Sequence, residues 1–116
     1  MSYITIAGNI VDEYADLRYS GSGSPWCKFT VAVNRKENDE WVSSFYRCKM
    51  FGEQAEYFAE SAVQGSRVMI TGRMQEEHWE NKDGEKRSGW VLMAQEGAMS
   101  TKYYPALPQK PERTDT

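Results

Sequence analysis

The chain has 116 residues, 40% of them hydrophobic and 27% charged, which is ordinary for one globular domain. No apolar run approaches the roughly 18 residues that cross a membrane, and the start of the chain lacks the features of a signal peptide, so we expect a cytoplasmic protein. The net charge of −3 argues against binding to nucleic acid through overall charge, although residues 26–51 hold five cations against three carboxylates.

The first half of the chain predicts three strands. Residues 3–11 alternate between apolar and polar positions, and Gly8 within them indicates a bulge or a close backbone approach. Residues 12–19 look irregular, and Gly21 to Pro25 form a turn. Strands over 26–34 and 41–51 then flank a polar loop at residues 35–40, which predicts a long hairpin.

The second half begins with a change of period. Apolar residues recur at helical spacing over residues 54–63, and Gly65 is a plausible helix-ending glycine. Strands are expected over 67–79 and 86–93, joined by the hairpin turn Asn81 to Gly84, with a further short strand near 99–103.

This order of elements indicates an all-β fold with one short helix. Three strands, a helix and two strands are typical of a five-stranded Greek-key barrel of the OB type, with the helix between the third and fourth strands. We expect one domain over residues 1–104. Residues 105–116 contain three prolines and little apolar side chain, and they predict a disordered tail.

The third predicted strand has two unlike faces. The even positions of residues 41–51 are mostly apolar, as expected for a core. The odd positions carry three aromatics, two cations and a serine: Trp41, Ser43, Phe45, Arg47, Lys49 and Phe51. Such a face suits a surface that stacks bases and binds phosphates.

The remaining chemistry is sparse. Cys27 and Cys48 fall on apolar strand faces and are expected to be buried free thiols, since a disulfide requires Cα atoms within about 7 Å. His78 is the one histidine, and we expect it to have a structural or surface role. The sequence shows no catalytic set and predicts no metal and no cofactor, so we do not expect an enzyme.

Seven motifs in order make the chain resemble bacterial and phage single-stranded DNA-binding proteins, from about Ile4 to Lys102. They are Ile6-Ala7-Gly8-Asn9-Ile10, Leu17-Arg18-Tyr19, the segment Phe29 to Arg35, the segment Phe45 to Gly52, Gly65-Ser66, Ile70-Thr71-Gly72-Arg73, and the segment Trp79 to Arg87. The resemblance implies an OB barrel that coats single-stranded DNA.

The resemblance also implies roles for individual residues. Phe45, Phe51 and Trp79 stand where the family stacks bases. The family's stacking site after its second strand has no aromatic here, and Trp41 is the nearest candidate for it, with packing as the alternative. Phosphate contacts are expected from seven cations: Lys28, Arg35, Lys36, Arg47, Lys49, Arg73 and Lys86. Trp26, Trp90 and Tyr57 are expected to pack instead.

Two features depart from the family pattern. Gln75, Glu76 and Glu77 stand on a strand where relatives often carry basic residues. The tail lacks the acidic tip, closed by proline and phenylalanine, that docks replication and repair proteins in cellular members. The short tail favours a protein of a phage or mobile element, located in the host cytoplasm.

The leading interpretation is therefore a sequence-independent coat for single-stranded DNA in replication, recombination and repair. The resemblance implies a homo-oligomer, with a tetramer favoured over a dimer, and replication proteins as further partners. The alternative is an OB-fold interaction module of a replication or primosome assembly. Such modules lose the stacking aromatics, so Phe45, Phe51 and Trp79 speak against it.

Overall fold

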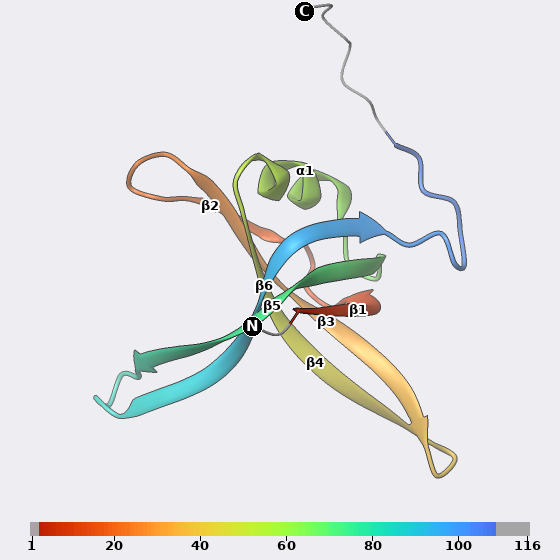
Figure 1. Cartoon of the computed structure of the whole chain (residues 1–116), viewed down its shortest axis with the longest axis horizontal. Coiled ribbons are helices and arrows are strands. Elements are labelled where there is room, and N and C mark those ends of the chain that lie inside the picture. The colour runs from red at the N-terminus through yellow and green to blue at the C-terminus, as the bar shows by residue number, and fades with distance from the viewer. Residues whose placement is uncertain (1–2, 109–116) are drawn as a thin grey trace, which may run out of the picture.

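A computed structural model describes residues 3–108 of the chain (Figure 1). Its elements in chain order are β1 (Tyr3–Ile10), β2 (Asp16–Tyr19), β3 (Pro25–Glu37), β4 (Glu40–Phe51), α1 (Glu53–Ser61), β5 (Arg67–Glu80) and β6 (Lys86–Met99).

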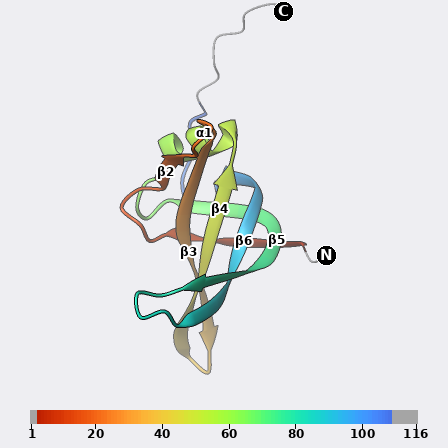
Figure 2. The same cartoon turned by 90° about the vertical axis from the view of Figure 1, so that its left-hand side faces the viewer.

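The strands form one sheet that closes on itself (Figure 2). The order across the sheet is β1-β5-β6-β4-β3-β2, and pairing of β1 with β3 closes a five-stranded barrel. Neighbouring strands are antiparallel except β4 and β6, which run parallel at Cys48↔Leu92. The helix α1 lies between β4 and β5 in the chain, so the predicted OB barrel with one short helix is confirmed.

The short strand β2 corrects the prediction of irregular structure over residues 12–19. It pairs with the start of β3, from Asp16↔Lys28 to Tyr19↔Pro25. Its four residues are too few to show a period, and three of them are polar or aromatic. Tertiary pairing with β3 therefore decides the conformation here, and the predicted turn over 21–25 joins the two strands.

The predicted loop over residues 35–40 is wrong. β3 and β4 continue as a two-stranded arm to a turn at Asn38 and Asp39, whose φ angles are 48° and 63°. Two successive residues with positive φ are typical of a tight hairpin turn. Both faces of this arm are largely solvent-exposed, so its strands need no apolar alternation and look like a loop in the sequence.

Other elements also differ from the prediction. β6 is one strand of 14 residues that ends at Met99, so there is no separate strand over 99–103. A bulge between Thr71 and Gly72 shifts the β5–β6 register and breaks the alternation there. The helix ends at Ser61 with Ala62 as its cap, whereas Gly65, with φ of 85°, lies in the following turn.

The core fills the barrel from the inward faces of the strands and from the helix. Its fully buried side chains include Ile10, Val31, Met50, Ile70 and Leu92, and Ala55, Phe58 and Ala62 cover one end. Cys27 and Cys48 are buried and free, as predicted.

Gly8 allows two strands to approach closely. A Cβ atom there would collide with the backbone carbonyl of Ala32 on β3, which confirms the close approach predicted from the sequence. Gly72 on β5 stands in the same relation to the carbonyl of Met93 on β6.

Within residues 3–108, no helix is long and apolar enough to cross a membrane. Pro105 to Pro108 form neither helix nor strand. The rest of the predicted tail, residues 109–116, lies outside the described residues.

Candidate nucleic-acid interface

The register of β3 and β4 sorts their side chains into two faces. Even residues of β3 stand opposite odd residues of β4, from Trp26↔Phe51 to Lys36↔Trp41. Directly opposed residues in a ladder share a face. We call the outer of these faces the platform; it consists of Trp26, Lys28, Thr30, Ala32, Asn34, Lys36, Trp41, Ser43, Phe45, Arg47, Lys49 and Phe51.

The platform presents large aromatic side chains to solvent. Trp41 is 72% exposed, Phe45 65% and Phe51 52%. Trp26 is half-buried and packs as predicted, its ring stacked on Phe51 with centroids 6.0 Å apart and planes 18° apart. The Phe51 ring is thereby supported by Trp26 on one side and still exposed to solvent on another. A side chain that stacks on a base needs both a fixed orientation and an exposed face.

Trp79 reaches the platform from the arm formed by the ends of β5 and β6. The Arg47 guanidinium carbon lies 5.5 Å from the centroid of the Trp79 indole. The same guanidinium donates a hydrogen bond from Nη2 to the carbonyl oxygen of Trp90, 3.3 Å away. Gly89 makes room for both groups, because a Cβ there would approach Arg47 Nη2 to 2.8 Å and the Trp79 ring to 3.2 Å.

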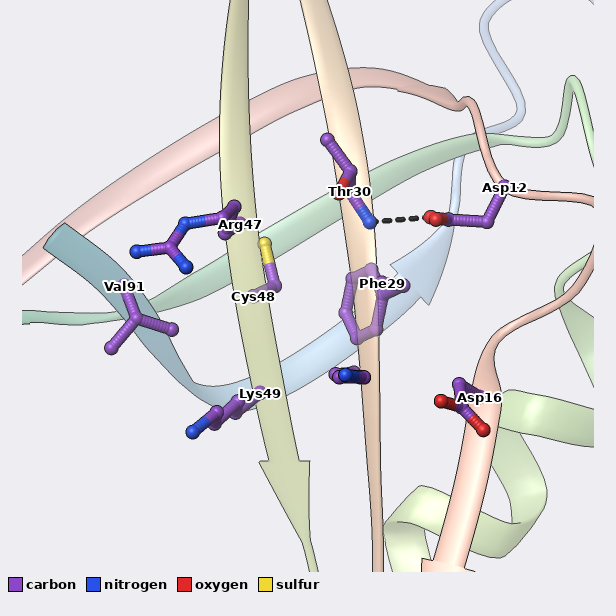
Figure 3. A pocket seen from close by; sticks show the side chains of 9 residues that line it. Asp12, Asp16, Phe29, Thr30, Arg47, Cys48, Lys49 and Val91 are labelled. Atoms are coloured by element: carbon purple, nitrogen blue, oxygen red, sulfur yellow. Dashed lines mark hydrogen bonds between the residues drawn. The ribbon is translucent and has the colours of Figure 1, made fainter. Parts of the chain in front are cut away.

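A hollow of about 330 Å³ lies beside these residues, and side chains of both charges line it (Figure 3). In Figure 3 Arg47 and Lys49 project from β4 on one side, and Asp12 and Asp16 lie on the other. The Asp12 carboxylate accepts a hydrogen bond from the backbone N–H of Thr30 and so fixes the chain that leads to β2.

One cation of the platform is already paired. Lys49 Nζ lies 2.7 Å from Glu77 Oε1 on β5, and it lies 5.6 Å from the centroid of the Trp26 ring. Lys28 stands directly opposite Lys49 in the ladder, and Lys28, Arg47 and Lys49 all line the hollow. Glu77 is therefore the carboxylate that pairs with Lys49 in a group of three cations, and Asp12 and Asp16 line the hollow with that group.

The other predicted phosphate contacts divide between faces. Lys36 belongs to the platform, opposite Trp41, whereas Arg35 stands opposite Val42 on the reverse face. Arg35 Nη1 donates to Ser44 Oγ at 2.6 Å, and its Nη2 lies 3.6 Å from Glu37 Oε2. Neither residue lies in a loop.

Arg73 and Lys86 also lie on different faces. Lys49 and Arg73 both pair with Met93, so the three residues form one row across β4, β6 and β5. Lys86 stands opposite Glu80, whereas Trp79 stands opposite Arg87, so Lys86 lies on the reverse face of its arm.

Two aromatics expected to pack are exposed. Trp90 is 58% exposed and stands opposite Glu76. Tyr57 is 57% exposed, and the charge of Glu53, to which its hydroxyl donates a hydrogen bond, raises the pKa of Tyr57. Trp90 is exposed because the reverse face of the β5–β6 arm meets solvent beyond the barrel, which strand parity alone does not reveal.

Sequence reasoning also missed Arg87, Gly89 and Glu77 as neighbours of the platform. Arg87 could have been found from the hairpin, since a turn at Asn81 to Gly84 places it opposite Trp79. No local signal marks Gly89 or Glu77, because their contacts depend on how the β5–β6 arm curves toward β4.

Comparison with known proteins gives concordant results. The model of the single-strand binding protein family matches residues 1–100. The chain is 35% identical to the single-stranded DNA-binding protein of Mycobacterium leprae, with 96% of this chain and 70% of that protein covered. It is also 35% identical to the protein of that name from Mycolicibacterium smegmatis, with coverage of 96% and 71%, and to single-stranded DNA-binding protein 2 of Streptomyces coelicolor, with coverage of 77% and 48%.

Proposed function

The chain belongs to the single-strand binding protein family, and on that premise we propose that it coats single-stranded DNA without sequence preference. Proteins of this family bind DNA and are not enzymes. The coating would keep DNA unpaired and protected during replication, recombination and repair.

The platform is the observation that carries this proposal. Its exposed rings offer flat faces to bases, and every base has a face to stack. Cations stand between the rings on the same face, where they can contact phosphates. Contacts of these two kinds read no base edges, so binding is largely independent of sequence.

Individual residues take distinct parts in the proposed complex. Phe45, Phe51 and Trp79 stack on bases. Trp41, the most exposed of the four aromatic residues, extends the row of stacking rings along the β3–β4 arm. Lys28, Lys36, Arg47, Lys49 and Arg73 contact phosphates. Arg35 and Lys86 lie on reverse faces of their arms, so they contribute only where the strand wraps around an arm.

We further propose a homo-oligomer, with a tetramer as the favoured state. The outer side of β1 and β5 bears the exposed side chains Tyr3 and Met69, which an interface could cover. We assign DNA binding to residues 1–104 and place the protein in the cytoplasm. The relatives named above are bacterial, so they lend no support to a phage origin.

Titration with poly(dT) tests the proposal. Stacking on Trp41 and Trp79 should quench tryptophan fluorescence, and the quenching should weaken as salt is added because phosphate contacts release counterions. A protein that shows neither quenching nor a gel shift with poly(dT) at low salt does not have this function. Double-stranded DNA of equal length serves as the control and should bind far more weakly.

A further inference from the structure

Glu77, on the strand β5, contacts the cationic part of the platform. Its carboxylate oxygen Oε1 lies 2.7 Å from Lys49 Nζ, and the Glu77 and Lys49 side chains are only 26% and 29% exposed. An ion pair so far withdrawn from solvent is less screened than one on an open surface.

The pair spans the strand β6, which lies between β4 and β5 in the sheet. Glu77 is opposed in the β5–β6 ladder by Gly89, which has no side chain. Lys49 meanwhile has a like charge directly opposite it in Lys28, and Arg47 lines the same hollow. Removal of the Glu77 charge would leave Lys49 without its paired anion, next to two further cations and with only Asp12 and Asp16 as carboxylates in the hollow. A lysine released in this way attracts phosphate.

A carboxylate and a phosphate bind a lysine ammonium in the same manner, oxygen to nitrogen at about 2.7–2.9 Å. The Glu77 oxygen therefore occupies a position that a phosphate oxygen would take on Lys49. The two anions cannot both hold that position.

We propose that Glu77 is an internal competitor for the phosphate of single-stranded DNA at Lys49. The inference rests on the proposed function and adds a determinant of affinity to it. When DNA binds, phosphate replaces the carboxylate on Lys49, and the released Glu77 takes up a cation from solution. The chain thereby binds more weakly, and with a smaller net release of cations, than it would without this carboxylate.

The test compares dT oligomer binding by the full chain and by the variant Glu77→Gln, which keeps the shape and removes the charge. We expect Glu77→Gln to bind about two- to fivefold more tightly at low salt, the range expected for loss of one partly exposed ion pair. The slope of log affinity against log salt should steepen by about 0.7, since no cation is taken up by residue 77.

Glu76→Gln is the matched control. It makes the same change of net charge one residue away, but Glu76 lies on the reverse face of the arm opposite Trp90 and pairs with His78. If both variants tighten binding equally, overall charge explains the effect and the proposal is wrong.

A double-mutant cycle tests the route through Lys49. In a Lys49→Gln background, Glu77→Gln should change affinity no more than Glu76→Gln does. A full gain in that background, or weaker binding by Glu77→Gln alone, would overturn the proposal. Circular dichroism checks folding, and Glu77→Asp, which shortens the reach of the carboxylate, should fall between wild type and Glu77→Gln.

These outcomes separate the two levels of the argument. If the wild-type chain does not bind dT oligomers, the proposed function itself is wrong. A wild-type chain that binds them, with Glu77→Gln equal to it in affinity and salt slope, contradicts only the competition at Lys49.

Discussion

The guanidinium of Arg47 on β4 lies over the indole ring of Trp79 on β5, with its carbon 5.5 Å from the ring centroid. A cation over an aromatic face is attracted by the ring, and this contact ties the β5–β6 arm to the platform. Arg47 thus has two parts in the proposed interface, since it can contact phosphate and also orient a stacking ring.

Replacement of Arg47 should therefore affect both affinity and its salt dependence. We expect Arg47→Ala to reduce the slope of log affinity against log salt by about 0.7, the value for one phosphate contact on a single strand. Titrations of dT oligomer at several salt concentrations measure the slope. Lys102→Ala removes one positive charge outside the platform, and an equal loss of slope in both variants would place Arg47 away from phosphate.

Phe51 should prove to be a binding residue more than a structural one. Loss of a stacked base costs about 1–3 kcal/mol, so Phe51→Ala should weaken dT binding by about fivefold or more. The contact with Trp26 makes a modest loss of thermal stability expected as well.

Tyr57→Ala is the matched control for Phe51→Ala, because Tyr57 is an aromatic of similar exposure on α1, away from the platform. It should leave the affinity for dT oligomers unchanged. An equal loss of affinity in both variants would show that the platform has no special part in binding.

Lys36 and Arg35 allow a comparison between neighbours on opposite faces. Lys36 shares the platform with Trp41, whereas Arg35 points to the reverse face and bonds to Ser44. We expect Lys36→Ala to weaken binding at low salt and Arg35→Ala to weaken it much less. Affinities from fluorescence quenching decide the matter, and a larger effect of Arg35→Ala would mean that the strand runs along the reverse face.

Much of the barrel follows from the sequence because its strands are buried on one face only. Alternation over residues 3–11, 26–34 and 67–79 therefore predicts β1, β3 and β5, and the helical spacing of Ala55, Phe58 and Ala62 predicts α1. Strand parity likewise placed Phe45 and Phe51 on an outer face, where the structure has them.

The β3–β4 arm could not be predicted in the same way, and neither could the curvature of the β5–β6 arm. Beyond the barrel both faces of β3 and β4 meet solvent, so Arg35 and Lys36 follow no apolar period and resemble a loop. The curvature of the β5–β6 arm brings Glu77 into contact with Lys49 and Trp79 into contact with Arg47. Curvature of that kind is a tertiary property with no local sequence pattern.

Gly8 should tolerate no side chain. A Cβ there would collide with the Ala32 carbonyl, so Gly8→Ala must shift β1 away from β3 at an expected cost of about 1–3 kcal/mol in the free energy of unfolding. Urea denaturation measures this loss. Gly21→Ala, in a turn with no other atom within 4 Å of the added Cβ, should stay within about 0.5 kcal/mol of wild type. Equal stability of the two variants would contradict the close approach.

The buried thiols make stability depend on pH in alkaline solution. Burial, with a smaller contribution from the charge of Asp12 and from Cys27, raises the pKa of Cys48 to about 12. An unfolded thiol has a pKa of about 8.5, so above that pH the unfolded chain loses a proton that the folded chain keeps. The free energy of unfolding should therefore fall as pH rises, by up to about 1.4 kcal/mol per pH unit for this thiol.

Urea denaturation at pH 8 and pH 10 tests this dependence. Cys48→Ala removes the titrating group, so it should be less stable than wild type at pH 8 because of the cavity, yet should lose less stability between the two values of pH. Both proteins contain the same other ionisable groups, so the difference between them reports on Cys48. A parallel decline of the two proteins would show that Cys48 is not the cause.

The two-stranded arms diverge from the barrel in Figure 1, and single-stranded DNA that binds both of them must restrict their motion. A ribbon of two strands with no core of its own is marginally stable, so its backbone amides should exchange with solvent faster than those inside the barrel. A ligand that contacts both Trp41 on one arm and Trp79 on the other would reduce the opening motions that allow this exchange. Part of the stacking energy would then be spent in stiffening the arms, so the measured affinity would depend on how rigid they already are.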